Sequence, residues 1–474
     1  MKRTANRFVA RLLSTLAASL PALLASSAGM AAEPFHAYTL LGEQGRTIVR
    51  VVTGADACPP VELDGRRTLA MSARAAKEEI PARAEPGSKP AAFPVLSCEL
   101  ELPAGVRRAS VAGQRLALPR MPPRRIVIIG DTGCRLKASA REFQGCADAQ
   151  AWPFAQISRA AARLKPDLVL HLGDYHYRES PCPEAEKGCA GSPWGNGYDA
   201  WDADFFVPAE PLLRAAPWLV VRGNHESCAR AGQGWFRFLD PRPYTAASSC
   251  NDPARDGDGD YSQPYAVPLG REDQFIVFDS ARAAGRAYAL GDEPFRRYEE
   301  QLRQVDVLAG QRRHSFFVSH HPVLGFTSAA NEVALPGNAA LQSVMTSLHP
   351  GRLFATGIDL AIHGHMHLFE SLSFASDHPA TIVVGNSGSS LYLPLPGILP
   401  EGAEPAPGAR VAEFFSYDDF GFLVMERRGK RWHLTERDRQ GRALLHCRLR
   451  QDKLHCTPSR KSSSRDLRVS RAAI

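Results

Sequence analysis

The chain has 474 residues, 44% of them hydrophobic and 23% charged, which is typical of a soluble globular protein with about two to three domain-sized units. Its formal net charge of +7 comes from its two ends, because residues 1–32 and 457–474 each contribute +4 and leave the body near −1. A near-neutral body does not indicate a nucleic-acid surface, so we expect no nucleic-acid partner.

The first 32 residues are predicted to be a secretory signal peptide. Four basic residues precede the apolar stretch "LLSTLAASLPALLA", and the small residues of "SSAGMAAE" follow it. The alternative is an uncleaved anchor, but Pro21 and the short apolar core argue against it. We expect cleavage between Ala28 and Ala32 and a periplasmic or secreted protein. No later apolar run approaches the roughly 20 residues of a membrane span.

Ten cysteines support export, because an even number of cysteines in an exported chain indicates disulfides. None forms the close double pair of a structural zinc site. Spacing does not determine connectivity, so pairing between sequence neighbours is only the favoured arrangement. It would link Cys58 with Cys98, Cys134 with Cys146, Cys182 with Cys189, Cys228 with Cys250, and Cys447 with Cys456.

Residues 33–120 are predicted to form a small β-rich module. The stretches "RTIVRVVT" and "VLSCELELP" are typical of strands, and "PRMPPRR" is typical of a linker. Near the other end, "GFLVMERRGKRWHLTERDRQGRALLHCRL" predicts a β-meander. The polar, aperiodic stretch at 457–474 is predicted to be a basic disordered tail.

Five short apolar runs between these regions are each followed at once by metal-capable side chains. Runs of this kind, separated by helical-looking segments, predict buried and largely parallel strands. Ligands commonly lie at the carboxyl ends of such strands, and glycine leaves room there for a sharp turn and an ion. Five cases in succession therefore predict a metal site. The side chains are, in chain order, Asp131; Asp174 and Tyr177; Asn224, His225 and Glu226; His320 and His321; and His363, His365 and His367.

The order GDTG, GDYHY, GNHE, HHP and GHMH resembles the calcineurin-like metallophosphoesterases. The tyrosine that ends the second motif makes the chain most similar to the purple acid phosphatases. The resemblance spans about residues 124–390, with a closing strand near 420–425. It implies an α/β fold: a four-layer αββα sandwich of two mixed β-sheets, with a phosphoesterase domain at 121–450 that includes the meander.

The same resemblance implies two metal ions. Asp131, Tyr177 and His367 would hold the first ion, Asn224, His320 and His365 the second, and Asp174 would bridge them. Nitrogen and oxygen ligands suit Fe, Zn or Mn, and the choice among these stays open. Two ions about 3.5–4 Å apart lower the pKa of bound water and supply hydroxide as the nucleophile. His225 would contact the phosphate and protonate the leaving group.

Several assignments have alternatives. Either histidine of "SHHP" could be the ligand; the family's histidine–any residue–proline order favours His320 and leaves His321, with Asn224, near the substrate. Tyr177 could instead be a packed aromatic residue. His171, His176 and His363 are expected to support the site without binding metal. Glu226 is expected to orient His225 or its loop.

The predicted function is an exported bimetallic phosphomonoesterase of acid-phosphatase type that acts on a phosphorylated small molecule. An alternative is a phosphodiesterase, possibly for cyclic nucleotides, on the same metal core. A third reading is a metal-containing binding protein without catalysis, although such a protein would not require His225. The insert at 178–206, directly after the second motif, is a candidate rim of the active site or else a plain surface loop.

Overall fold

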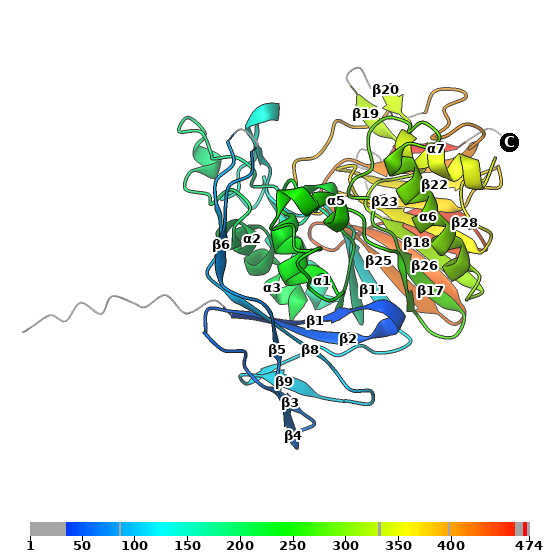
Figure 1. Cartoon of the computed structure of the whole chain (residues 1–474). Helices are drawn as coiled ribbons and strands as arrows, with labels where there is room; N and C mark the ends of the chain where they lie inside the picture. Colours follow the sequence, from blue (N-terminus) through cyan, green and yellow to red (C-terminus); the bar gives the residue numbers. More distant parts are fainter. Residues whose placement is uncertain (1–34, 85–86, 330–332, 397–398, 460–467, 472–474) are drawn as a thin grey trace, which may run out of the picture. The chain divides into compact units, whose positions relative to one another are not determined.

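A computed structural model describes residues 35–84, 87–329, 333–396, 399–459 and 468–471; the predicted signal peptide lies outside these residues. Two large mixed sheets dominate this part of the chain (Figure 1). Among the described residues, eleven strands form the first sheet, in the order β28 (Lys453–Pro458), β27 (Ala443–Arg450), β26 (Arg431–Asp438), β25 (Gly421–Arg428), β11 (Arg125–Ile129), β14 (Leu168–His171), β15 (Trp218–Val220), β1 (Phe35–Leu41), β2 (Thr47–Thr53), β8 (Leu96–Glu101) and β5 (Ser72–Ala75).

The second sheet has eight strands within the described ranges and contains the strands before the HHP and GHMH motifs. Its central strands β17, β18, β21 and β23 run parallel to one another. The order is β16 (Tyr265–Pro268), β17 (Asp273–Val277), β18 (His314–Ser319), β21 (Ile358–His363), β23 (Ala380–Val384), β22 (Phe369–Phe374), β24 (Val411–Tyr417) and β29 (Arg468–Arg471).

Successive residues of a strand point to opposite faces of its sheet. The central strands therefore contribute side chains both to the core between the two sheets and to the core between a sheet and its helices. Ile126 and Ile128 of β11 belong to a buried core shared with Phe316 and Val318 of β18, which joins the two sheets. Val127 and Ile129 instead belong to a core with residues of the outer helices. The first sheet is covered by α1 (Phe154–Arg163), α2 (Tyr198–Trp201) and α3 (Val207–Leu213), and the second by α6 (Glu293–Ala309) and α7 (Ala339–Leu348) (Figure 1). The predicted αββα sandwich is confirmed.

The N-terminal region is rich in strands, as predicted, but strands on both sides of residue 120 share one sheet. β1 pairs in parallel with β15 through Leu40 and Trp218, and β2, β8 and β5 continue from it. A smaller sheet packs against these strands, and the two share a buried core that includes Val49 and Val51 of β2. It contains β10 (Gln114–Arg115), β9 (Ala109–Val111), β3 (Val61–Leu63) and β4 (Arg67–Leu69).

The remaining described elements are short. Three are two-stranded pairs: β6 (Glu78–Ile80) with β7 (Ala91–Phe93), β12 (Leu136–Lys137) with β13 (Glu142–Phe143), and β19 (Thr327–Ala329) with β20 (Val333–Leu335). Short helical segments complete the chain: η1 (Glu43–Gly45), η2 (Ala138–Ala140), η3 (Lys187–Cys189), η4 (Asp202–Phe206), η5 (Asn224–Glu226), α4 (Gly232–Gly234), η6 (Trp235–Leu239), η7 (Pro253–Arg255) and α5 (Asp256–Gly259).

The C-terminal part contains the expected meander and one difference from the prediction. β25 lies antiparallel beside β11 and closes the first sheet, followed in turn by β26, β27 and β28. Residues 468–471, within the stretch predicted to be disordered, form β29 and pair with β24. Pairing with an edge strand supplies the backbone hydrogen bonds that composition alone does not indicate.

All ten cysteines form disulfides, and the five pairs are the sequence-neighbour pairs favoured above. Disulfides persist in oxidising compartments, so this pattern favours an extracellular or secreted setting. Among the described residues, no helix combines the length and apolar character needed to cross a membrane.

Glu370 of β22 generates a prediction about stability. Its carboxyl group is buried and accepts a hydrogen bond from the backbone N–H of Phe326. Burial raises the pKa of Glu370 to about 8, only partly offset by this hydrogen bond. Because the folded pKa lies above the unfolded value, the contribution of Glu370 to stability is complete below about pH 4.5 and is lost as the pH rises towards 8.

We therefore expect Glu370→Gln, which keeps an acceptor oxygen but does not ionise, to remove this loss. The free energy of unfolding of the variant should rise relative to wild type by a few kcal/mol between pH 5 and pH 8. Urea denaturation of the chelator-treated proteins measures it, with the exposed Glu272→Gln as control. If the free energy of unfolding depends on pH in the same way in wild type and Glu370→Gln, the prediction is contradicted.

Candidate metal centre

The loops at the carboxyl ends of β11, β14 and β21 hold three predicted ligands in an uncommon backbone conformation. Asp131, Asp174 and His365 have φ angles of 55°, 57° and 69°, in the left-handed region. Such residues persist only where surrounding contacts enforce them, and they cluster at functional sites. Gly223 shows how close the packing is, since a Cβ atom there would lie 2.1 Å from Asp174 Oδ1. Only glycine fits beside that carboxylate.

The first predicted set of ligands converges around the hydroxyl group of Tyr177. This oxygen lies 2.7 Å from Asp174 Oδ2, 2.9 Å from Asp131 Oδ1 and 2.7 Å from His367 Nε2. His367 Nε2 is 3.4 Å from Asp131 Oδ1. Four side chains from three loops thus bring their donor atoms to one place.

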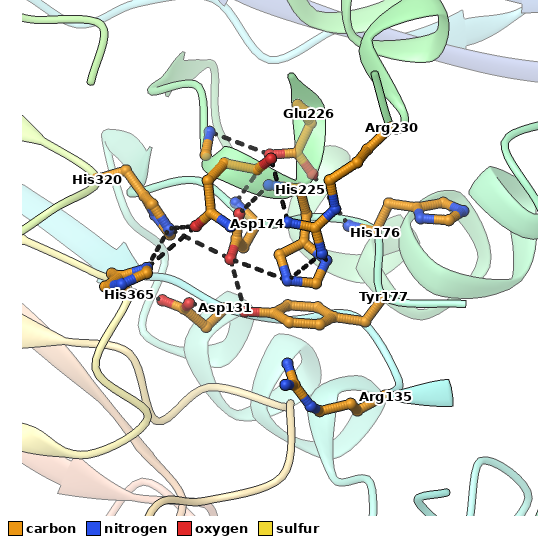
Figure 2. Close-up of polar contacts among 12 residues, drawn as sticks. Asp131, Arg135, Asp174, His176, Tyr177, His225, Glu226, Arg230, His320 and His365 are labelled. Atoms are coloured by element: carbon orange, nitrogen blue, oxygen red, sulfur yellow. Dashed lines mark hydrogen bonds and ion pairs between the residues drawn. The ribbon is translucent and has the colours of Figure 1, made fainter. Parts of the chain in front are cut away.

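The second predicted set converges on the other side of Asp174 (Figure 2). Asn224 Oδ1 lies 3.0 Å from both His320 Nε2 and His365 Nδ1, and these two nitrogens are 3.2 Å apart. His320 Nε2 is 3.2 Å from Asp174 Oδ2. One oxygen of Asp174 therefore faces Tyr177 and His320 together, the position expected of a bridging ligand. Within the described ranges, Asp174, His320 and His365 place their ligand atoms within 4.8 Å of one another.

Two histidines have their second ring nitrogen held by backbone. His320 Nδ1 lies 2.9 Å from the carbonyl oxygen of Leu172, and His367 Nδ1 lies 2.5 Å from that of Ser390. Donation from Nδ1–H to a carbonyl selects the tautomer in which Nε2 carries a free lone pair, the usual arrangement of metal-binding histidine. In both residues that Nε2 faces the cluster.

Of the two adjacent histidines in "SHHP", His320 enters the cluster. The Nδ1 atom of His321 lies 3.2 Å from Ser280 Oγ, and its backbone N–H donates to the same oxygen. Its ring nevertheless lies beside that of His365, with 4.2 Å between centroids. His321 is therefore at the margin of the cluster, where a substrate group could meet it.

The charges of the cluster suit cations. Burial alone would raise the pKa of Asp174, but His320 and His225 lower it well below its usual value. Burial lowers the pKa of His320, and Asp174 outweighs this and raises it to about 9. Burial, with the carboxylates of Asp131 and Asp174, raises the pKa of Tyr177 well above its usual value. Buried carboxylates require compensation, and oxygen and imidazole donors around one point fit metal ions that would supply it.

Two buried acids that hold the loops were only partly anticipated. Glu226 accepts hydrogen bonds from four backbone N–H groups, those of Gly223, Asp174, Tyr175 and His176. It thus holds the loop after β14, not the ring of His225. Asp204 of η4 accepts from Tyr177 N at 2.7 Å and from Arg178 Nε at 2.5 Å. Asp204 lies outside every motif, so local sequence carries no signal for it.

His225 lies against the cluster with two partners that the motifs do not contain. Its backbone N–H donates to Asp174 Oδ1 at 2.9 Å, and its Nε2 lies 3.8 Å from Asp174 Oδ2. Glu179 Oε1 is 3.0 Å from its Nδ1, and the guanidinium of Arg230 is 2.6 and 2.7 Å from its two ring nitrogens (Figure 2). Burial and Arg230 lower the pKa of His225 to about 4.

The other histidines named from the sequence make separate contacts. His171 bonds with Thr132 Oγ1, His176 with the carbonyl of Gly195 and His363 with Ser319 Oγ, each at 2.9 Å. These partners orient the three rings beside the loops. The expectation that they support the site remains consistent with this placement.

The insert at 178–206 divides into two parts. Residues 198–206 form α2 and η4, in which Trp201, Phe205 and Phe206 are fully buried in the outer core. The earlier part contains Glu179, the Cys182–Cys189 disulfide and the half-buried Trp194. Only this earlier part lies where a rim of the site is possible.

Oxygen and imidazole donors thus cluster in loops after the central parallel strands of two mixed sheets, an arrangement that fits a metal-dependent hydrolase. Residues 124–369, just over half of the chain, match the family model described as "Calcineurin-like phosphoesterase". The chain belongs to that family, and the recognition made from the motifs is confirmed.

Curated relatives agree with this class. The chain is 25% identical over 324 residues to the "Probable inactive purple acid phosphatase 1" of Arabidopsis thaliana, covering 63% of this chain and 45% of that protein. It is 26% identical over 261 residues to the "Nucleotide pyrophosphatase/phosphodiesterase" of Hordeum vulgare, covering 52% of this chain and 59% of that protein. The chain thus spans about half the length of these relatives.

A solved structure shares the fold. The purple acid phosphatase PPD1 from yellow lupin (Lupinus luteus) seeds superposes with a TM-score of 0.54 and 17% identity, covering 89% of this chain and 74% of that one. At this identity the likeness establishes the fold alone. The family and its purple acid phosphatase relatives imply a dinuclear metal centre.

The position of Asp174 between the two sets of ligands leads to a prediction. We expect Asp174→Asn to lose bound metal and turnover, because an amide cannot neutralise two cations as a carboxylate does. Metal analysis and a free-thiol assay measure the outcome, and the five disulfides should stay intact. The exposed Asp148→Asn is the control. Two metal ions per chain in Asp174→Asn would refute the bridging role.

Proposed function

We propose that this protein is an exported phosphomonoesterase of acid-phosphatase type that hydrolyses the ester of a phosphorylated small molecule with two metal ions. One observation supports this most directly: the donor atoms of Asp131, Tyr177, His367, Asn224, His320 and His365 lie on the two sides of Asp174. The five disulfides and the predicted signal peptide favour the periplasm or the exterior of the cell.

The proposed ligands form two sets, one for each metal ion, and the side chains within each set lie close to one another. Asp131, Tyr177 and His367 would hold one ion and Asn224, His320 and His365 the other, with Asp174 between them. Two bound ions of Fe, Zn or Mn supply an activated water and neutralise the phosphate. Asn224 and His365 are partly exposed, so the phosphate can approach from their side, where His321 is also close.

His225 is proposed to serve the leaving group. Its Nε2 is the ring nitrogen nearest Asp174 Oδ2, and Glu179 holds the other ring nitrogen. A phosphate dianion beside His225 would offset the cationic Arg230 and favour the protonated ring. The imidazolium could then donate its Nε2 proton to the departing oxygen.

Two other functions are separated from this one by specific observations. The barley relative is named a nucleotide pyrophosphatase/phosphodiesterase, so a diesterase on the same metal core is the second candidate. The Arabidopsis relative is named probable inactive, so a binding protein without catalysis is the third candidate. This chain retains His225 and every predicted ligand, which supports catalysis.

The experiment that tests the proposal is a substrate panel. Purified protein supplied with Fe, Zn or Mn is assayed from pH 4 to 9 with an aryl phosphomonoester, a bis-aryl phosphodiester and cyclic nucleotides. We expect the highest kcat/KM for the monoester at mildly acidic pH. A preference for diesters would favour the second candidate, and hydrolysis of none of them would refute the proposal.

His225→Ala should separate chemistry from metal binding. We expect near-normal metal content and a turnover reduced by about 10²–10⁴-fold, the usual scale of general acid catalysis. Steady-state kinetics and metal analysis measure the two quantities. The control is His455→Ala, an exposed histidine on β28. Loss of both metals from His225→Ala would instead make His225 a ligand.

Tyr177→Phe tests the resemblance to purple acid phosphatases. A phenolate is a hard donor that suits Fe(III), and coordination favours its deprotonated form. The iron-loaded wild type should show a visible charge-transfer band, and the variant should lose this band while Asp131 and His367 remain. An uncoloured wild type that is fully active with two Zn or two Mn would make Tyr177 a packing residue.

A further inference from the structure

A cationic groove lies beside the proposed metal centre. This cavity has a volume of about 500 Å³ and is lined by parts of the chain far apart in sequence. Its chemistry-bearing lining residues are Arg83, Lys89, Lys137, Glu179, Trp194 and Arg230. The family match begins at residue 124, so Arg83 and Lys89 come from a part of the chain outside it.

Four cations line this groove, but Arg83 is paired with Asp256 at 2.7 Å and Arg230 with Glu179, so Lys89 and Lys137 carry its excess positive charge. Glu179 is its one carboxylate in the described lining, and it is shared among Lys137 at 3.9 Å, Arg230 and His225. Lys89 lies 3.7 Å from Asp199, outside the lining, and the pair is partly exposed. Exposed pairs of this kind contribute little and can exchange partners. An anion entering the groove would therefore meet cations that are only partly neutralised.

The groove meets the catalytic centre at His225. Arg230 and Glu179 line the cavity and also contact the ring of His225, whose Nε2 faces Asp174. Figure 2 shows Arg230 reaching His225 on the side away from His320 and His365. His225 is the group proposed to protonate the leaving oxygen, so the groove extends from the leaving-group side of the phosphate.

Trp194 adds an aromatic surface to the cationic lining. It is half-buried, and Lys89 Nζ lies 4.7 Å from its ring centroid. An aromatic or other carbon framework could pack against this ring while an attached anion meets Lys89 or Lys137. The groove thus offers an aromatic surface for the carbon framework of an organic anion and cations for its charged group.

We propose that this groove binds a second anionic group carried by the leaving group, so that the preferred substrates are phosphomonoesters of organic anions, such as bisphosphates. The inference rests on the proposed function, because it assigns a substrate class to the same site. It adds a specificity-determining role for Lys89 and Lys137, which contact neither the proposed ligands nor His225 in the interactions described above.

The test compares phenyl phosphate with 1,4-phenylene bisphosphate, which adds only a second phosphate to the same ring. The metal-loaded wild type should prefer the bisphosphate by about tenfold in kcat/KM. Lys89→Ala/Lys137→Ala should lose most of this preference through KM, since each partly exposed ion pair contributes up to about fivefold. Its kcat/KM for phenyl phosphate should change less than twofold. Comparing the same two substrates across variants cancels their difference in intrinsic reactivity.

Matched variants distinguish the loss of the two lysine charges from a general effect of the substitutions on the fold. Lys89→Arg/Lys137→Arg keeps both charges and should keep the preference, and Lys187→Ala removes an exposed lysine of the insert that does not line the groove. Thermal denaturation checks that all variants fold. As a readout without turnover, quenching of tryptophan fluorescence by 1,4-phenylene bisphosphonate should weaken in Trp194→Phe.

The outcomes separate the two proposals. Hydrolysis of phenyl phosphate with no preference for the bisphosphate would overturn the groove inference and leave the proposed function standing. A preference that survives in Lys89→Ala/Lys137→Ala would also overturn the inference. Hydrolysis of neither substrate by the metal-loaded protein would refute the proposed function, and the substrate assignment with it.

Discussion

The buried carboxylate of Asp174 is the group on which the rest of the centre depends. Its Oδ2 faces Tyr177 on one side and His320 on the other, and its Oδ1 accepts the backbone N–H of His225. A carboxylate in this position costs free energy unless cations and hydrogen bonds compensate it. His320, Tyr177 and the backbone N–H of His225 supply such contacts, and the glycine at 223 leaves room for the carboxylate.

A ring of supporting contacts keeps that carboxylate in place. Glu226 holds the backbone on both sides of Asp174, and Asp204 holds Tyr177 from a helix of the outer layer. Carbonyl oxygens select the tautomers of His320 and His367. Because these partners come from separate loops, they hold the donor side chains against several parts of the fold, which lowers the cost of ordering the ligands.

The same architecture separates reaction chemistry from substrate choice. The strand ends of the two sheets carry the donors, whereas the groove with Lys89, Lys137 and Trp194 is built by the N-terminal region and the segments after β11, β14 and β15. Rigid strands with variable loops allow one metal core to serve different substrates. The fold therefore accounts for the reaction class, and we propose that the loops determine the choice of substrate.

The strands before the motifs and the order of the motifs could be predicted from the sequence, because a short apolar run followed by Gly and Asp, Asn or His is a local pattern. The resemblance carried by those motifs implied the four layers, and the pairing observed for the ten cysteines is the one that was favoured without being determined. The folded structure was needed to show that β1 joins β15, that His320 and not His321 turns towards Asp174, and that Glu179, Asp204 and Arg230 reach the site. These outcomes depend on pairing and packing between distant segments, where no local pattern of charge or hydrophobicity records which side chains will meet.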